Sequence, residues 1–160
     1  MTLGTMLHQR IRQATRAVLN SIHQISHSRP EKDEEPEVLA VSNCYPTRIV
    51  LYAAAFQGGW KVRFMKSLGE AHEASHFRRP KAMFYDRTAG DPRWHQYCSS
   101  FAREGIPFVL LAHRNDDETF LDVLCSGGYP ACGNPLTSET VVNAVILALE
   151  MASLTPVIQM

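Results

Sequence analysis

Asp86 follows a short apolar run, residues 82–85, that predicts a buried β-strand. In an open α/β sheet, chemistry gathers at the carboxyl ends of the strands, so this carboxylate marks the expected site. The positions expected at the neighbouring strand ends are Ser42, Asn43, Ala112 and Asn134. Phosphoryl transfer to a carboxylate relies on positioning and on neutralisation of charge, for which further acids, a hydroxyl and a lysine are needed. These positions contain neither the acids nor the lysine, and Ala112 provides no hydroxyl.

A second pattern, His72-Glu73-Ala74-Ser75-His76, matches the zinc-binding sequence H-E-x-x-H. On a helix, two imidazoles four residues apart face the same way and can share a zinc ion, with Glu73 as general base. The context argues against a protease, because the next glutamate is Glu104, across a predicted strand and helix. A zinc hydrolase using His72, Glu73 and His76 is therefore the less favoured alternative. Metal binding by the two histidines is expected to be functionally trivial, so no metal site is assigned.

Short apolar runs alternate with helical patterns from Glu37 onward. The expected strands are residues 38–41, 60–64, 82–86, 107–112 and 129–132. The expected helices are residues 46–56, 68–77, 92–104, 116–124 and 137–153. Five strands alternating with five helices in about 120 residues predict an α/β domain, a parallel sheet with helices on both faces.

The chain divides into four segments. Residues 1–27 carry apolar side chains at alternating spacings of four and three, which predicts an amphipathic N-terminal helix. A frayed extension and a helix that pairs with another surface both fit this pattern. Residues 28–37 contain two prolines and an acidic run, which indicates a solvated linker. Residues 38–153 form the α/β domain, and residues 154–160 form a tail.

The order of these features resembles a receiver domain of the two-component response regulators, over roughly residues 37–153. The features that carry the resemblance are Ser42-Asn43 after the first strand, Gly59 at the start of the second, Ser67 to Ala71, Asp86 ending the third, Ile106-Pro107 before the fourth, and Asn134-Pro135-Leu136 before the last helix. The resemblance implies the flavodoxin-like (βα)5 fold, a doubly wound parallel sheet with strand order 2-1-3-4-5. Residues 1–27 would then be an extra helix.

Family receivers carry a phosphoryl group on an aspartate, and the resemblance places that role at Asp86. The other family positions are the two Mg²⁺-binding acids, a hydroxyl, a mobile aromatic residue and a lysine, and they fall on Ser42 and Asn43, Ala112, Ala131 and Asn134 respectively. Mg²⁺ prefers carboxylate oxygens, so the metal should bind poorly here. Loss of metal and lysine together should slow phosphorylation by orders of magnitude. We therefore predict a degenerate receiver.

Two other interpretations of Asp86 stay open. In a functional phosphorelay receiver, Arg48, Arg87 or His113 would have to replace the missing cations. Alternatively, Asp86 is a relic, or it is an N-cap for the loop after the strand.

The last expected helix is apolar on nearly every side. Its apolar surface is therefore larger than the part that one face of a sheet can cover. By the resemblance, receivers commonly pair through this region. We expect a homodimer through the helix, with Val142, Val145, Ile146 and Leu149 as interface residues. The N-terminal helix of the same chain is the alternative cover.

Composition limits the remaining possibilities. Sixteen basic and sixteen acidic residues cancel, which argues against nucleic-acid binding, and no apolar run reaches the length of a membrane span. The four cysteines form no CxxC pair, as expected for free thiols in the cytoplasm. The chain also ends soon after its last helix, with no room for an output domain. We expect a stand-alone signalling protein that is not an enzyme, needs no cofactor and binds a protein partner, a sensor kinase or another signalling protein.

Overall fold

The structure, a computed structural model, describes residues 35–114 and 116–154. The predicted helix over residues 1–27, most of the linker and the tail from residue 155 lie outside the described residues. Pro36 and the described residues after it belong to one compact unit.

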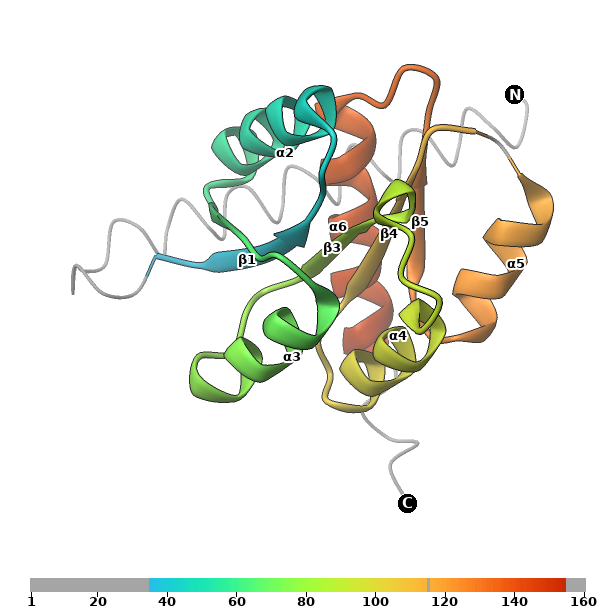
Figure 1. The fold of residues 1–160 in the computed structure, drawn as a ribbon. Coiled ribbons are helices and arrows are strands. Elements are labelled where there is room, and N and C mark those ends of the chain that lie inside the picture. Colours follow the sequence, from blue (N-terminus) through green and yellow to red (C-terminus); the bar gives the residue numbers. More distant parts are fainter. Residues whose placement is uncertain (1–34, 115, 155–160) are drawn as a thin grey trace. The chain divides into compact units, whose positions relative to one another are not determined.

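Five parallel strands form the central sheet (Figure 1). They are β1 (Glu37–Val41), β2 (Lys61–Phe64), β3 (Met83–Asp86), β4 (Phe108–Ala112) and β5 (Tyr129–Cys132). Their order is β2-β1-β3-β4-β5, which confirms the predicted flavodoxin-like sheet. The register places Val41 beside Tyr85 and Asp86 beside Leu111, so the carboxyl ends of β1, β3 and β4 meet at one edge.

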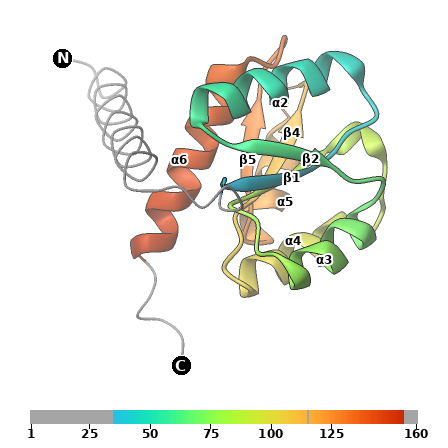
Figure 2. The ribbon, with the colours of Figure 1, turned by 90° about the vertical axis from the view of Figure 1, so that its left-hand side faces the viewer.

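Helices cover both faces of this sheet (Figure 2). On one face α2 (Tyr45–Gly58) packs against α6 (Ser138–Leu154). On the other lie α3 (Leu68–Phe77), α4 (Trp94–Arg103) and α5 (Asp117–Cys125). Each of these helices and strands was predicted, with shifts of one or two residues at most ends.

Local sequence signals explain where the helices begin and end. Ser67 starts α3, because its hydroxyl accepts a hydrogen bond from the Glu70 N–H at 3.1 Å. Gly59 ends α2 with a φ of 74°, a left-handed conformation that favours glycine. It therefore terminates the helix and does not open β2, which begins at Lys61. The expected helix over 92–104 begins only at Trp94, after the 3₁₀ turn Arg87–Ala89 and a second turn in which the Trp94 N–H donates to the Asp91 carbonyl.

A core cluster lies between the sheet and the helices α3, α4 and α5. Its largest side chains are fully buried and come from β1, β3, β4 and α4: Leu39, Tyr85, Phe108 and Phe101. Burial of these rings and branched side chains excludes water from this face of the sheet. It also holds β1, β3 and β4 in place, and the carboxyl ends of these strands form the expected site.

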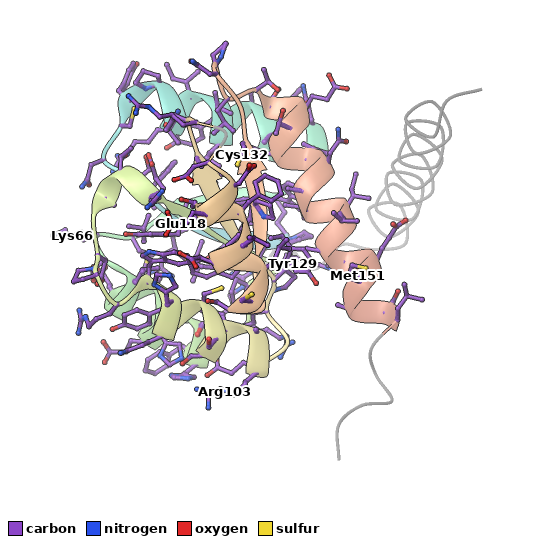
Figure 3. All side chains as sticks on the ribbon, turned by 90° about the vertical axis from the view of Figure 1, so that its right-hand side faces the viewer. Lys66, Arg103, Glu118, Tyr129, Cys132 and Met151 are labelled. Carbon is purple, nitrogen blue, oxygen red and sulfur yellow. The ribbon has the colours of Figure 1, made fainter. Side chains whose placement is uncertain are left out.

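The structure corrects the predicted contact residues of the last helix. Val142, Val145 and Ile146 are buried within the chain, at 7% exposure or less, and Leu149 is half-buried. The large apolar side chains that α6 exposes are Leu147, Met151 and Leu154. Figure 3 shows Met151 on the last turns of α6, and Tyr129 and Cys132 at the two ends of β5. Because α6 packs on both α2 and the sheet, the face that it buries is wider than the single apolar stripe of a helix that packs on a sheet alone.

No described helix is long and apolar enough to cross a membrane. All four cysteines are free thiols.

Candidate functional site

Asp86 is the last residue of β3, and its side chain is completely buried. Ser42 follows β1 directly and is buried beside it, at 1% exposure. Parallel pairing of β1 with β3 brings these two side chains together from positions 44 residues apart. The predicted location of the site, at the carboxyl edge of the sheet, is where the structure places Asp86.

Neutral donors satisfy both oxygens of the Asp86 carboxylate. The Ser42 hydroxyl donates to Oδ2 at 2.7 Å. The Thr88 N–H and hydroxyl both donate to Oδ1, at 3.0 and 2.7 Å. Asp86 thereby caps the 3₁₀ turn that follows β3, which confirms the capping role considered from the sequence.

The other receiver positions supply no charge to this carboxylate. Asn43 and Asn134 are exposed on the surface, and Ala112 is buried with a methyl group as its whole side chain. The peptide bond between Asn134 and Pro135 is cis. Ala131 lies buried in β5. The set of side chains around Asp86 is therefore neutral at each position that the resemblance assigns to an acid or a lysine.

Of the three substitute cations considered, the structure places only His113 near Asp86. Its Nε2 lies 3.8 Å from Asp86 Oδ1 and 3.1 Å from the Thr47 hydroxyl. Arg48 donates instead to the Ser42 carbonyl at 2.9 Å and lies over the Phe64 ring. An arginine contact with Asp86 is thus absent among the described residues.

Arg87 points away from Asp86 towards the start of α5. Its guanidinium donates to the Thr119 hydroxyl and lies 3.5 Å from Asp116 Oδ2. Hydrogen bonds, first of all the one from Thr119, lower the pKa of Asp116. Arg87 therefore stabilises the α5 end of the molecule and leaves the Asp86 carboxylate to its neutral donors.

Two threonines complete the site and were missed in the sequence. Thr88 stands two residues after Asp86, the spacing of a side-chain-capped turn, so a local signal for it existed. Thr47 is buried in the first turn of α2 and reaches His113 from 66 residues away. The two meet because β1 and β4, which precede them, end at the same edge of the parallel sheet.

This arrangement can hold a buried carboxylate in one orientation, and it offers little to a hard cation. Mg²⁺ keeps near-octahedral oxygen coordination and is held through carboxylates. Among the described residues Asp86 supplies the one carboxylate of the site, and its oxygens are already engaged.

No family model and no curated protein matches the sequence. Solved structures do match. A putative response regulator from Chloroflexus aurantiacus superposes with a TM-score of 0.63 and 17% identity, over 73% of this chain and 99% of its own. The receiver domain of the TMAO respiratory system response regulator TorR gives 0.62 and 17%, over 73% and 98% of the two chains.

NtrX from Brucella abortus superposes with a TM-score of 0.61 and 19% identity over 74% of this chain, which spans 28% of the NtrX chain. The described chain has the fold of a response-regulator receiver domain. These likenesses establish the order of strands and helices. What the receiver fold does in this protein has to be argued from its own side chains.

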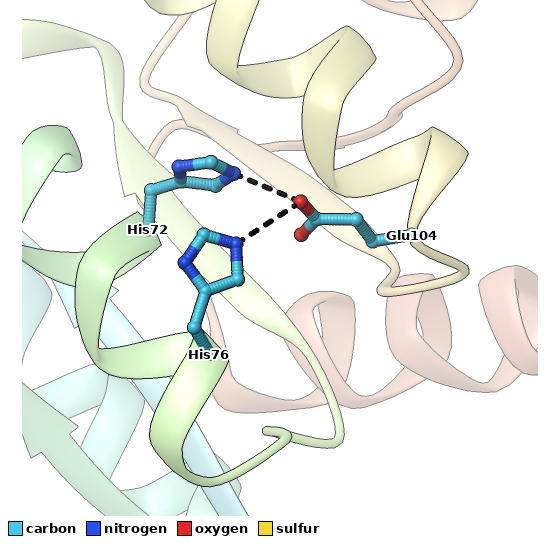
Figure 4. A group of neighbouring side chains, drawn as sticks. All are labelled: His72, His76 and Glu104. Carbon is cyan, nitrogen blue, oxygen red and sulfur yellow. Dashed lines mark hydrogen bonds and ion pairs between the residues drawn. The ribbon is translucent and has the colours of Figure 1, made fainter.

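A separate cluster of ligand-type side chains lies where α3 meets the end of α4. His72 and His76 come from α3, and Glu104 caps α4. The Nε2 atoms of His72 and His76 lie 3.0 and 3.4 Å from the same oxygen, Glu104 Oε1 (Figure 4). Burial raises the pKa of Glu104, but hydrogen bonds from the two histidines outweigh it and the net direction is downward.

The sequence argues against a protease because a predicted strand and helix separate Glu104 from His76. The structure shows that this separation in the sequence does not keep the two side chains apart. In the fold, α3 and α4 pack side by side on one face of the sheet, which closes a gap of 28 residues. Glu73, the general base of the H-E-x-x-H pattern, is exposed.

Proposed function

We propose that this chain is a receiver-fold signalling domain that works through protein–protein contact, without standard Mg²⁺-dependent phosphorylation of Asp86. The observation that carries the proposal is the neutral set of donors around Asp86: Ser42 and Thr88 occupy both of its oxygens. The domain would be a degenerate receiver with no enzymatic activity of its own.

The physical argument rests on charge. A phosphoryl group brings negative charge to a buried carboxylate, and only preorganised positive charge makes that favourable. Here His113 is the single ionisable partner at ion-pair distance among the described residues, at 3.8 Å. One imidazole, also engaged by Thr47, is a weak replacement for a divalent ion and a lysine.

An exposed apolar face on α2 supports contact with a protein partner. Four large side chains spaced four, three and four residues apart face solvent on this helix: Tyr45, Ile49, Tyr52 and Phe56. Phe56 is 89% exposed. Isolated exposed apolar residues are common, but a continuous stripe of them is typical of an interaction surface. The partner would be a sensor kinase or another signalling protein.

A second copy of the chain is the proposed occupant of the outer face of α6. Its exposed residues are Leu147, Met151 and Leu154, again spaced four and three apart. This homodimer uses the helix expected from the sequence, with other contact residues. The four free thiols fit a reducing compartment, and we propose the cytoplasm.

Beryllofluoride with Mg²⁺, a mimic of the phosphoryl group, tests the proposal by NMR. We expect the amide shifts of the full chain to be the same with and without the mimic, because the site lacks the charge needed to hold it. Saturable shifts around residues 42, 86 and 113 that disappear in Asp86→Ala would instead support the alternative, a functional phosphorelay receiver with His113 as substitute.

A further inference from the structure

Three side chains of the kind that bind transition metals converge between α3 and the end of α4. The ligand atoms of His72, His76 and Glu104 all lie within 4.8 Å of one another. Figure 4 shows both imidazoles directed at the same carboxylate. This site shares no residue with the site around Asp86, so the inference does not rest on the function proposed above.

The distances between these ligand atoms suit an ion with tetrahedral coordination. Bonds of about 2.0–2.1 Å at tetrahedral angles place neighbouring ligand atoms roughly 3.3 Å apart. The Nε2 atoms of His72 and His76 lie 3.0 and 3.4 Å from Glu104 Oε1. Small rotations of the side chains would therefore bring all three ligands into bonding distance of one ion.

The protein holds part of this cluster in place. His72 packs edge-on against Phe101, with ring centroids 5.2 Å apart, and against Tyr97 at 5.9 Å. His76 stacks edge-on with His72 at 4.7 Å. Glu104 is fixed at its backbone, because its N–H closes the end of α4 by bonding to the Ser100 carbonyl. Ligands that are already oriented lose less entropy when an ion binds.

We propose that His72, His76 and Glu104 bind one Zn²⁺ ion, which joins α3 to the end of α4. Two imidazoles and a carboxylate are a zinc ligand set that leaves the fourth position for water. The side chains of His76 and Glu104 are 57% and 34% exposed, so the ion would be reached from solvent. A hydrolytic zinc needs a shaped cavity that excludes water, and this exposure favours binding and bracing over catalysis.

Zinc titration of the full chain by calorimetry tests the proposal. We expect one site, with affinity reduced by at least about tenfold in Glu104→Gln and in His76→Ala, since even the loss of an outer partner costs a metal site that much. The same titration with Mg²⁺ should give no heat from this site, because imidazole suits zinc better than it suits hard cations. At one fixed zinc concentration, zinc should also raise the melting temperature of the wild type by more than it raises that of Glu104→Gln.

Two controls separate this site from other histidines. His95 lies 3.7 Å from Asp122 and forms a comparable surface pair, without a third ligand among the described residues, so His95→Ala should keep full zinc affinity. His23 and His27 are also four residues apart in the sequence, and His23→Ala/His27→Ala should keep it too. Loss of zinc binding in that double variant, or full affinity in Glu104→Gln with an unchanged metal-free melting temperature, would overturn the proposal. So would absence of zinc binding by the wild type.

Discussion

Hydroxyl and amide donors hold Asp86 in place. Among the described residues, few positively charged groups lie near its carboxylate. Ser42 bridges the ends of β1 and β3 by donating to the Asp86 carboxylate at 2.7 Å. The same hydroxyl accepts from the Cys44 N–H at 3.2 Å. Ser42 therefore orders the loop into α2 as well as the acid. Ser42, at a position that the resemblance assigns to a metal-binding acid, therefore has a structural role.

Removal of the Ser42 hydroxyl should therefore be costly. Ser42→Ala leaves a buried carboxylate oxygen without its donor, which typically costs about 1–3 kcal/mol. We expect the free energy of unfolding in urea to fall by that amount. Ser153→Ala is the matched control, because its hydroxyl bonds to the Glu150 carbonyl on the exposed end of α6 and its loss should change little. Equal stability of Ser42→Ala and the wild type would show that the hydrogen bond has no structural role.

At the scale of residues, the sequence predicted the acid and two of its neighbours, Ser42 and His113, and missed Thr47 and Thr88. The apolar run before Asp86 fixed its place at a strand end, because a buried strand can be read from four or five residues. Thr47 lies 66 residues from His113 in the sequence, and the two meet only in the fold. The same holds for Glu104, which packing of α3 on α4 brings to His72 from 32 residues away.

Helices and strands were predicted more fully than contacts, for a physical reason. Alternation of apolar runs with amphipathic stretches, and stops such as Gly59, are properties of neighbouring residues. Which side of a helix is buried depends on what packs there. α6 is covered by α2 and by the sheet at once, so Val142, Val145 and Ile146 face inwards and the outer face is left to Leu147 and Leu154.

The outer face of α6 should control self-association. Leu147→Glu with Leu154→Glu places two charges on this surface, and the like charges of two copies would repel and would be costly to desolvate. We expect sedimentation velocity to show a dimer for the wild type and a monomer for this variant. Ile49→Glu, on the exposed face of α2, is the control and should stay dimeric. A monomeric wild type, or a variant that dimerises as before, would contradict the proposed interface.

At the scale of the whole domain, parallel topology explains why the two sites differ. It gathers the ends of β1, β3 and β4 around Asp86, where receivers place their chemistry, and here the groups that donate hydrogen bonds to Asp86 are neutral. The cluster of His72, His76 and Glu104 instead arises from helix packing on one face of the sheet. The fold is that of a receiver, while the side chains able to bind a metal have a different location.

Mg²⁺ binding at the sheet edge is the property on which the degenerate-receiver account depends most. The direct measurement is a Mg²⁺ titration of the full chain, followed by the amide shifts of residues 42, 43 and 86. We expect no saturable change in the wild type, and a saturable change in Asn43→Asp with Asn134→Lys, which returns an acid and a lysine to the site. Saturable Mg²⁺ shifts in the wild type that disappear in Asp86→Asn would contradict the account.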